Sequence, residues 1–413
     1  MKIGIFTDTY HPDINGVVTS IKMLEQEMKR RGHEVYIFSP TKHEPTENQN
    51  LYMLKSIPLL LAKKYNYRIA TFYSRTTAKK IKDLKLDVIH TQSEFSLGHF
   101  AKIISRKYDI PLVHTYHTMW EDYVHYIVPI KGGRNIYPKK FCRKYSKAFV
   151  AKADAIISPS KKTEKYLKYR CKIKNKDIFI VPTGINLEPF RKENFTDKMK
   201  SDLKKKIGLK KEDKVILFVG RIAEEKSIDV LIKGMPEILK EEPKAKLVIV
   251  GDGPSVDSLK ELCKNLKVEK NVIFTGRQSW EKIAIFYNIG DVFVNASTTE
   301  TQGLTFVEAM AAELPVCAKY DTNLDGIIKH NETGMFFHLD KEYPKTVLKL
   351  LQNKDLCEKL SKKGLESAEK YSVKYFGESL EKIYEFAIKH HKEVHEKRAA
   401  KRKFLKRKQE NNE

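Results

Sequence analysis

Short runs of β-branched and aliphatic residues alternate with longer stretches of helical spacing along the whole chain. This alternation is typical of parallel β-sheets wrapped by helices, so the pattern predicts an α/β protein. A stretch of helical spacing, 17–30, follows the first predicted strand. In the first half of the chain the predicted strands are 2–7, 34–39, 87–90, 112–116, 155–158 and 178–181.

The second half repeats this pattern after an interruption. Turn-forming residues at 182–190 and a charged stretch through Lys211 predict a linker. Ser227, Ser255 and Ser279 each precede a stretch of helical spacing and are predicted N-caps, and the chain after Pro344 is predicted to be helical to its end. The predicted strands are 214–220, 246–251, 272–275, 291–295, 315–318 and 335–338.

The length supports two domains. At 413 residues and 48.0 kDa the chain is about twice as long as one hydrophobic core usually organises. We expect two doubly wound, Rossmann-like domains at 1–185 and 186–375, followed by a C-terminal helix and basic tail at 376–413. Ligands of such folds bind beyond the carboxyl ends of the strands, so the expected site is a central cleft faced by both domains.

Composition excludes several classes of protein. Apolar residues make up 41% of the chain, which is too many for a disordered protein. The five cysteines form no metal-binding or disulfide pattern, so we expect a reducing compartment. No apolar stretch approaches the roughly 18 residues of a transmembrane helix, and we expect no secretory leader at the start.

The positive charge is unevenly distributed. The formal net charge is +25: residues 1–185 carry +18, residues 389–408 carry +8, residues 186–388 carry only +1, and residues 409–413 carry −2. An excess confined to one domain and the tail favours an anionic partner surface. The tail has few apolar residues, so we expect it to touch such a surface electrostatically or else to be a solvated, frayed helix.

Anionic lipid is the preferred surface. Basic residues are interleaved with aromatic and aliphatic ones at 57–68 and 126–147, as in segments that lie in a headgroup layer. The alternative is that these stretches are solvated helix faces. No RNA-recognition, zinc-finger or basic recognition-helix signature supports nucleic acid as a partner. The residues expected to face the membrane are Lys63, Lys64, Arg68, Lys139, Lys140, Arg143 and Lys144.

Two glycine-containing turns could hold phosphate. Gly16 lies between the first strand and the following helix, where backbone amides and the helix terminus favour an anion. The second turn contains Gly251 and Gly253. Neither turn has the G-x-G-x-x-G spacing, so a nicotinamide dehydrogenase is disfavoured.

The strongest cluster of candidate residues follows two strands of the second half. Arg221 and Lys226 come after the strand at 214–220, where a guanidinium and an ammonium can neutralise a diphosphate. After the strand at 291–295, two carboxylates suited to sugar hydroxyls flank a predicted helix start that could bind an anion. This second group consists of Glu300, Gly303, Leu304, Thr305 and Glu308.

These motifs together resemble retaining glycosyltransferases of family 4, which have the GT-B fold. The resemblance implies that the C-terminal helix crosses back to the first domain. Glu300 and Glu308 resemble the family's Glu-x7-Glu motif, Arg221 and Lys226 its diphosphate pair, and Gly16 its N-terminal glycine loop. The segments 6–12, 90–98 and 114–126 are similar to the bacterial branch that glucosylates diacylglycerol at the cytoplasmic membrane face. The resemblance places His117 against the donor hexose and Glu121, Asp122 and Tyr123 toward the acceptor. His114 and His125 are expected to make structural hydrogen bonds.

The resemblance implies a peripheral membrane enzyme that transfers glucose from UDP-glucose to the 3-hydroxyl of 1,2-diacylglycerol with retention of configuration. The expected partners are the UDP-sugar, diacylglycerol and anionic lipids, without nucleic acid. No Asp-x-Asp motif occurs, so no metal or other cofactor is expected. Thr301 and Gln302 replace the Gly-Phe of many members, which leaves the donor hexose open. The alternatives are another acceptor for the same enzyme class, or a non-catalytic basic scaffold.

Overall fold

The computed structural model describes residues 1–413 except 12, 14–15, 41–49, 59–67, 118–135, 175, 298–302 and 411–413. The chain divides into two compact units. Unit 1 comprises Met1–Gly184 together with Val373–Glu413, and unit 2 comprises Ile185–Ser372. The sequence pattern places the corresponding boundaries at 185 and 375.

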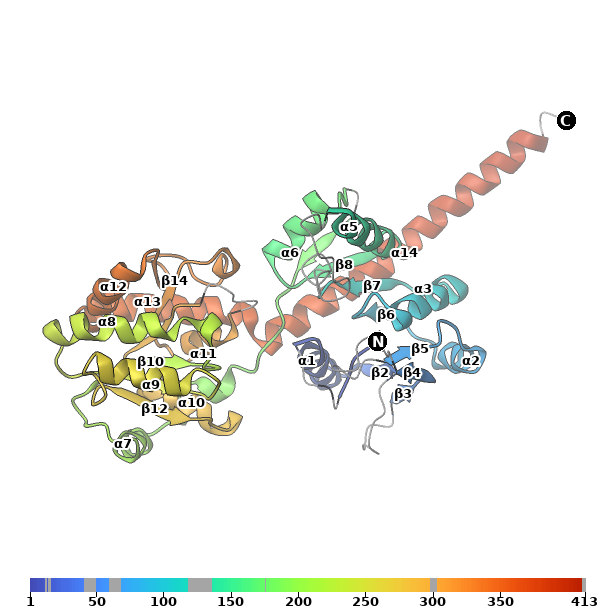
Figure 1. Ribbon diagram of the computed structural model, residues 1–413. Helices are drawn as coiled ribbons and strands as arrows, with labels where there is room; N and C mark the ends of the chain where they lie inside the picture. Colours follow the sequence, from blue (N-terminus) through green and yellow to red (C-terminus); the bar gives the residue numbers. More distant parts are fainter. Residues whose placement is uncertain are drawn as a thin grey trace. The chain divides into compact units, whose positions relative to one another are not determined.

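Unit 1 is built on a seven-stranded parallel sheet in the order β3-β2-β1-β6-β7-β8-β9 (Figure 1). A separate two-stranded antiparallel sheet, β4–β5, belongs to the same unit. The strands are β1 (Lys2–Phe6), β2 (Glu34–Ser39), β3 (Leu51–Met53), β4 (Ser56–Pro58), β5 (Arg68–Ala70), β6 (Val88–Thr91), β7 (Leu112–Thr115), β8 (Ala155–Ser158) and β9 (Ile178–Ile180).

Helices cover both faces of this sheet because successive strand residues point to opposite sides. Ile3 and Ile5 of β1 pack with α1 and α14, whereas Phe6 packs with α2 and α3. The helices are α1 (Gly16–Arg30), α2 (Arg75–Leu84), α3 (Ser96–Tyr108), α5 (Ile136–Val150), α6 (Lys161–Lys165), the π-helix η2 (Tyr166–Arg170) and α14 (Val373–Glu410).

The C-terminal helix α14 is an integral part of unit 1. It packs on α1 and runs along β6, β7 and β8. Arg31 Nη1 donates to Glu381 Oε2 at 2.7 Å, and His33 Nε2 lies 2.7 Å from Oε1 of the same carboxylate. Gly377 allows close approach, since a Cβ there would lie 2.5 Å from Glu27 Cγ. The C-terminal helix therefore returns to the first domain.

Unit 2 contains a six-stranded parallel sheet in the order β12-β11-β10-β13-β14-β15. Leu217 and Val219 of β10 face α10 and α11, whereas Ile216 and Phe218 face α8, α9 and α12. The strands are β10 (Lys214–Val219), β11 (Ala245–Val250), β12 (Val272–Gly276), β13 (Val292–Asn295), β14 (Val316–Lys319) and β15 (Met335–Phe337). The helices are α7 (Asp197–Lys206), α8 (Ile228–Glu241), α9 (Val256–Asn265), α10 (Trp280–Ile289), α11 (Leu304–Ala311), α12 (Tyr343–Gln352) and α13 (Lys354–Ala368).

The twelve strands predicted from the sequence are all present, and three local predictions need correction. Ser227, Ser255 and Ser279 stand at N-cap positions, but none of their side chains makes a capping hydrogen bond. The charged stretch expected as a linker contains α7, whose first turn is capped by Thr196 through a 3.3 Å bond from the Met199 amide. The predicted C-terminal helix is broken at Asn353 and again between 369 and 372.

Candidate active site

The candidate site in unit 2 lies where the sheet order reverses. The chain passes from β10 through α8 to β11 on one side, and from β13 through α11 to β14 on the other. Because β10 and β13 are adjacent and parallel, the loops that follow them leave the same edge of the sheet. Arg221 and Lys226 lie in the first loop, and Gly303 ends the second. Such a reversal is the usual ligand-binding position of an open α/β sheet.

The loop after β10 presents two cations at this edge. The Arg221 side chain is 68% exposed, and its Nη1 lies 3.9 Å from Glu225 Oε1. An exposed pair of this kind contributes about 1 kcal/mol at most, so an incoming phosphate can displace it at little cost. Lys226 ends the short 3₁₀ helix η5 (Glu224–Lys226). The Ser297 hydroxyl donates to the Glu225 carbonyl at 3.3 Å, which ties this helix to the loop after β13.

The glycines at 251 and 253 serve close packing of the backbone rather than a nucleotide fingerprint. A Cβ on Gly251 would lie 1.8 Å from the Gly220 carbonyl oxygen, and one on Gly253 would lie 2.1 Å from that of Ile222. The two loops are joined by hydrogen bonds from the Ile222 amide to the Asp252 carbonyl and from the Ser255 amide to the Ile222 carbonyl. Both positions therefore have to be glycine for the loop that carries Arg221 to keep its course.

The loop after β13 leads into the N-terminus of α11. Gly303 precedes this helix in the left-handed conformation, with φ of 56°, which favours glycine. The amides of Leu304 and Thr305 belong to the first turn, where a helix has no carbonyl partners for its N–H groups, so they suit an anion. Glu300, the first carboxylate of the motif, lies outside the described residues.

Glu308 is held one turn further into α11. The Tyr287 hydroxyl of α10 donates to Glu308 Oε2 at 2.7 Å. Burial raises the pKa of Glu308 to about 7, and the Tyr287 hydrogen bond opposes this rise. The ionised carboxylate can therefore accept hydrogen bonds from a ligand through both oxygens at and above neutral pH, whereas in acid one oxygen carries a proton and the negative charge is lost.

Unit 1 has a corresponding reversal between β1 and β6. Asp8, just after β1, accepts hydrogen bonds from the hydroxyls of Ser93 and Ser96, at 2.6 and 2.5 Å, and from the Leu97 amide at 3.1 Å. Asp8, which follows β1, thus caps the N-terminus of α3. Burial raises the pKa of its carboxyl group. Gly16 is the first residue of α1, which follows the same strand.

His117 lies beyond the carboxyl end of β7, at this edge of unit 1. Its Nε2 lies 2.7 Å from Gln92 Oε1, which can only accept, so the proton is on Nε2. Gln92 Nε2 lies 3.1 Å from His90 Nε2, and His90 Nδ1 lies 2.8 Å from the Tyr384 hydroxyl of α14. Burial lowers the pKa of His117 to about 3 and that of His90 well below its usual value. A chain of neutral side chains therefore runs from α14 to His117.

His114 has the structural role expected from the sequence. Its ring is fully buried, with Nδ1 2.8 Å from the Thr91 hydroxyl and Nε2 3.2 Å from Glu94 Oε1. His125 and the predicted acceptor-side residues Glu121, Asp122 and Tyr123 lie outside the described residues.

The predicted membrane-facing cations fall into two groups. Arg68 is engaged within the β4–β5 sheet, because its Nε and Nη2 donate to Ser56 Oγ and O, both at 2.8 Å. Lys139, Lys140, Arg143 and Lys144 lie on α5, where Lys140 and Lys144 are exposed. Phe141 is 70% exposed beside them. Lys63 and Lys64 lie outside the described residues.

Comparisons with known proteins identify the family. Residues 14–189 match the family described as "Glycosyltransferase Family 4", and residues 199–367 match "Glycosyl transferases group 1". The alpha-monoglucosyldiacylglycerol synthase of Acholeplasma laidlawii is 34% identical, covering 93% of this chain and 96% of the relative. The synthase of the same name from Streptococcus pneumoniae is 36% identical, covering 94% of this chain and 86% of the relative.

The chain belongs to glycosyltransferase family 4.

Solved glycosyltransferases share its fold. HepE from Anabaena, crystallised with UDP, superposes with a TM-score of 0.69 at 15% identity, covering 93% of this chain and 99% of that one. WaaG, a glycosyltransferase of lipopolysaccharide biosynthesis, superposes with a TM-score of 0.61 at 16% identity, covering 93% and 99% of the two chains. The expected GT-B fold, with two Rossmann-like domains and a returning C-terminal helix, is thus confirmed.

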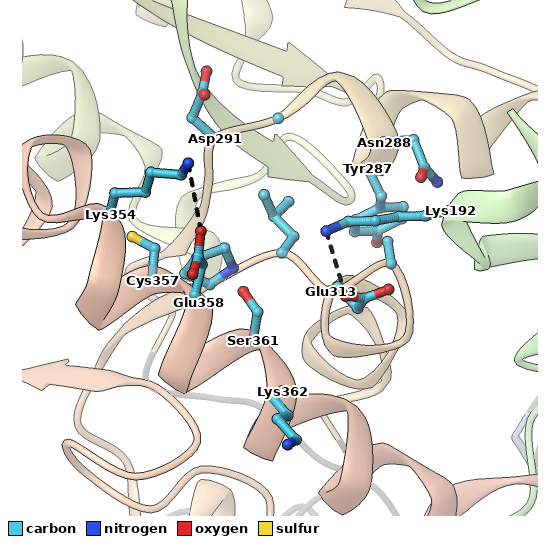
Figure 2. A pocket seen from close by; sticks show the side chains of 14 residues that line it. Lys192, Tyr287, Asn288, Asp291, Glu313, Lys354, Cys357, Glu358, Ser361 and Lys362 are labelled. Carbon is cyan, nitrogen blue, oxygen red and sulfur yellow. Dashed lines mark ion pairs between the residues drawn. The ribbon is translucent and has the colours of Figure 1, made fainter. Parts of the chain in front are cut away.

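A cavity in unit 2 of this glycosyltransferase lies away from the predicted site. It measures about 430 Å³ and is lined by residues of α10, α13 and the loops before β13 and β14 (Figure 2). Asp291 and Pro315 precede these strands, so the cavity lies at the amino edge of the sheet, opposite Arg221 and Gly303. Two ion pairs lie in it, Lys354–Glu358 and Lys192–Glu313.

The structure adds several residues to the candidate site that the sequence did not indicate. Tyr287 holds Glu308, Asp8 joins the loops after β1 and β6, and Gln92, His90 and Tyr384 hold His117. Asp8, His90 and Gln92 fall within the segments that resemble the family, which was the only available signal for them. Tyr287 and Tyr384 lie in helices, at positions where the sequence pattern predicts ordinary core residues.

Proposed function

We propose that this glycosyltransferase transfers glucose from UDP-glucose to the 3-hydroxyl of 1,2-diacylglycerol and retains the α configuration. The observation that carries the proposal is the identity of 34–36% over at least 93% of the chain to two alpha-monoglucosyldiacylglycerol synthases. The concentration of positive charge in residues 1–185 and 389–408 supports an acceptor that resides in an anionic membrane.

In this proposal the donor diphosphate binds at the carboxyl edge of the unit 2 sheet. Arg221 and Lys226 supply fixed positive charge, and the Leu304 and Thr305 amides supply the positive end of a helix. Glu308 accepts hydrogen bonds from the ribose hydroxyls, and Glu300 orients the hexose, as the family motif implies. His117 is neutral, and its Nδ1 remains able to accept a hydrogen bond from the hexose.

In the proposed reaction the protein stabilises the departing UDP and does not supply a nucleophile of its own. The acceptor oxygen forms a bond to the anomeric carbon while the bond to the diphosphate breaks, and the electron pair leaves with UDP. We propose that attack occurs on the leaving-group face, so that a diphosphate oxygen takes the proton of the acceptor hydroxyl. Preorganised cations and amides then stabilise the charge that develops in the transition state. These groups are proposed to suffice without a metal ion.

The proposed acceptor requires peripheral contact with the inner face of the cell membrane. Among the described helices, none combines the length and apolarity needed to span a bilayer. On α5, Phe141 is exposed between Lys140 and Lys144, a combination that suits the interface between headgroups and acyl chains. We therefore propose anionic lipids as partners of unit 1.

Turnover on vesicles tests this function. Purified protein should release UDP from UDP-glucose when anionic vesicles contain diacylglycerol, and activity should fall as salt screens the surface. Lys226→Ala should lower kcat on the order of 100-fold, because one fixed charge at the leaving group is lost. Lys240→Ala, an exposed lysine near the far end of α8, is the matched control and should keep full activity.

Two results would contradict parts of the proposal. Equal activity of Lys226→Ala and Lys240→Ala would remove the diphosphate site. Turnover indifferent to anionic lipid and to salt would remove membrane docking while leaving the transferase intact.

A further inference from the structure

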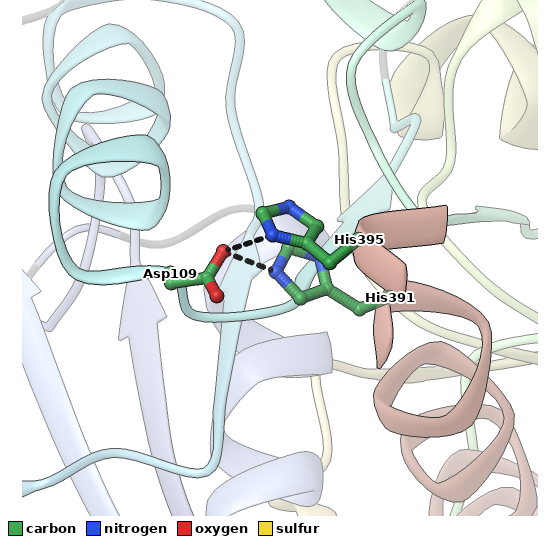
Figure 3. A group of neighbouring side chains, drawn as sticks. All are labelled: Asp109, His391 and His395. Carbon is green, nitrogen blue, oxygen red and sulfur yellow. Dashed lines mark hydrogen bonds and ion pairs between the residues drawn. The ribbon is translucent and has the colours of Figure 1, made fainter. Parts of the chain in front are cut away.

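Two histidines of α14 and one aspartate of unit 1 converge at the amino edge of its sheet (Figure 3). His391 and His395 are separated by one helical turn and their rings stack, with centroids 4.5 Å apart. Asp109, which ends α3 in the left-handed conformation, faces both rings. Its Oδ1 lies 3.1 Å from His391 Nε2 and 3.0 Å from His395 Nδ1.

A fourth residue fixes the orientation of His391. Asp154 Oδ2 lies 3.0 Å from His391 Nδ1 and also accepts the Leu112 amide at 2.8 Å. A carboxylate only accepts, so His391 carries a proton on Nδ1 and donates it to Asp154. In neutral His391 the Nε2 lone pair then faces the Asp109 oxygen at 3.1 Å, so either a second proton on His391 or a metal ion can occupy the position between them. The two carboxylates raise the pKa of His391, so protons compete with a metal for this nitrogen.

We propose that Asp109, His391 and His395 form a binding site for a divalent transition metal, with zinc as the fitting ion. Two imidazole nitrogens and one carboxylate oxygen are a common zinc donor set. The donor atoms all lie within 4.8 Å of one another, and tetrahedral ligands at about 2.0–2.1 Å from zinc are separated by roughly 3.3 Å. Asp154 supplies the outer carboxylate that commonly orients a metal-bound histidine.

The surroundings allow an ion to enter and to keep a water ligand. The side chains of Asp109 and His395 are 60% and 43% exposed, whereas His391 and Asp154 are each 13% exposed. The site is thus anchored on its inner side and open on its outer side. Two carboxylates offset the charge of the bound cation.

The site fastens a helix rather than serving the transfer reaction. Asp109 and Asp154 precede β7 and β8, whereas His117 follows β7 at the other end. Four strand residues at about 3.3 Å each separate these edges by roughly 13 Å. The metal would join α14 to the loops before β7 and β8, immediately ahead of the basic stretch that begins at Lys397. It would thereby fix the part of α14 from which this basic stretch extends.

Metal binding by the purified full chain tests the proposal. After treatment with EDTA and dialysis, ZnCl₂ should bind with a stoichiometry one higher in the wild type than in His395→Ala, measured by calorimetry. At a zinc concentration about 100-fold above the dissociation constant, the ratio of folded to unfolded protein should rise about 100-fold. His390→Ala is the matched control, because His390 stacks on Phe386 and lies outside the cluster.

A second probe keeps the test independent of stability. CoCl₂ should give intense visible bands of tetrahedral cobalt in the wild type and in His390→Ala, and these bands should be lost in Asp109→Asn, which retains a residue tolerant of the left-handed conformation. Zinc stoichiometry and cobalt spectra that are the same in the wild type, His395→Ala and Asp109→Asn would overturn the proposal. So would the absence of any zinc-dependent shift in the wild type, since the cluster would then be an ordinary set of ion pairs.

Discussion

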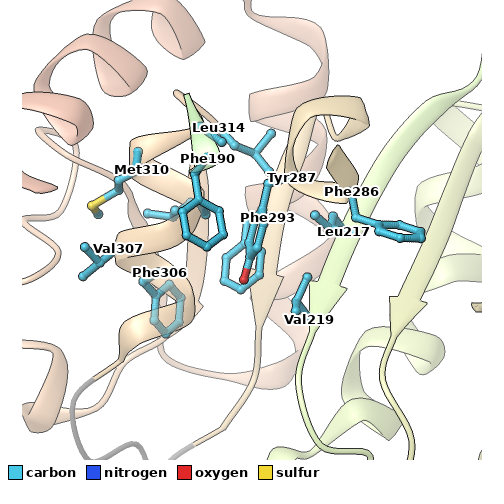
Figure 4. Close-up of a cluster of buried hydrophobic side chains, with 14 of the residues drawn as sticks. Phe190, Leu217, Val219, Phe286, Tyr287, Phe293, Phe306, Val307, Met310 and Leu314 are labelled. Carbon is cyan, nitrogen blue, oxygen red and sulfur yellow. The ribbon is translucent and has the colours of Figure 1, made fainter. Parts of the chain in front are cut away.

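At the scale of single residues, the pair Tyr287 and Glu308 links the hydrophobic core of unit 2 to its candidate site. Tyr287 is buried, with Phe190 and Phe293 at ring-centroid distances of 5.6 and 5.7 Å (Figure 4). Its hydroxyl is the polar end of an otherwise apolar side chain and reaches the Glu308 carboxylate. The core packing therefore fixes the position of a ligand-binding group.

The pKa of Glu308 predicts a pH dependence of donor binding. Because this pKa is raised to about 7, the affinity for UDP-glucose should fall as the pH drops below 7 and the carboxylate becomes protonated. Tyr287→Phe removes a hydrogen bond that lowers this pKa, so it should move the midpoint to higher pH. Calorimetric titration with UDP-glucose between pH 5.5 and about 8.5 measures both.

The same shift has a defined sign for stability. The pKa of Glu308 is higher in the folded state than its ordinary value of 4.5, so its contribution to stability is complete below that value and is lost as the pH rises through 7. Glu308→Gln should remove the pH dependence of binding near pH 7 and the part of the pH dependence of stability that Glu308 contributes. An unchanged binding profile in this variant would show that another group titrates.

The chain of side chains behind His117 predicts an effect of a distant tyrosine. In Tyr384→Phe the N–H group at His90 Nδ1 loses its acceptor, which favours the tautomer that carries the proton on Nε2. The Nε2–H group of His90 then faces the amide N–H of Gln92, and the two donors repel each other. His117 should then lose its partner, and kcat should fall about fivefold, the equivalent of about 1 kcal/mol. The Michaelis constant for UDP-glucose should change little.

A second buried tyrosine provides the control for this variant. The Tyr343 hydroxyl is buried and has no hydrogen-bond partner within the part of the chain that is described. Tyr343→Phe should therefore leave kcat unchanged. Equal losses of kcat in Tyr384→Phe and Tyr343→Phe would mean that His117 does not depend on the chain.

Residues of the candidate site were predictable from the sequence only where they follow strands in a recognisable order. Arg221, Lys226 and Gly303 meet this condition, because adjacent parallel strands bring their loops together. The partners of His90 and Glu308 could not be predicted, since Tyr384 lies 294 residues from His90 and Tyr287 lies 21 residues from Glu308 in a different helix. Nothing in their spacing distinguishes them from core tyrosines.

At the scale of elements, strands of four to six residues were predictable because burial on both faces makes them continuous apolar runs. Of the five three-residue strands that the structure describes, β9 and β15 were predicted, whereas β3, β4 and β5 were missed, since segments this short carry no periodic signal of their own. Helix α7 was missed because it has no fully buried residue and reads as a charged linker. The cap at Ser227 failed for a different reason: this residue adopts a left-handed conformation, whereas a capping serine has an extended one.

The close packing of two loops predicts a large effect of one methyl group. In Gly253→Ala the new Cβ would lie 2.1 Å from the Ile222 carbonyl oxygen, so the backbone must move. We expect a loss of about 2–3 kcal/mol in the free energy of unfolding, measured by urea denaturation, together with weaker UDP-glucose binding. Gly208→Ala is the control: its φ is +80° but no atom lies within 4 Å, so it should cost about 1 kcal/mol and spare binding. A Gly253→Ala variant as stable as Gly208→Ala would contradict this account of the loops.

The exposed aromatic residue of α5 predicts a specific loss of membrane binding. Phe141→Ala should weaken binding to anionic vesicles about fivefold in a sedimentation assay, because it removes the apolar group that can enter the headgroup region. Leu339→Ala, which removes a side chain 52% exposed in unit 2, should bind as the wild type does. If Phe141→Ala also bound normally, α5 would not be the docking element.

At the scale of the whole molecule, the sequence pattern predicts two doubly wound domains because it restarts after a stretch of turn-forming residues. The return of α14 to unit 1 was available only through the family resemblance, since helical periodicity does not show what a helix packs against. The charge difference between the two halves also belongs to this scale. This difference indicates the kind of surface that the protein binds. It does not indicate the fold, since net charge governs association rather than topology.

The most direct test of the central claim is mass spectrometry of the lipid product after incubation with competing donors and acceptors. UDP-glucose, UDP-galactose and UDP-N-acetylglucosamine would be supplied together with diacylglycerol, glucosylated diacylglycerol and a soluble sugar. We predict a single main product, diacylglycerol carrying one hexose derived from UDP-glucose, with the α linkage confirmed by NMR. A product built on another acceptor, or unmodified diacylglycerol in the presence of all three donors, would contradict the proposed function.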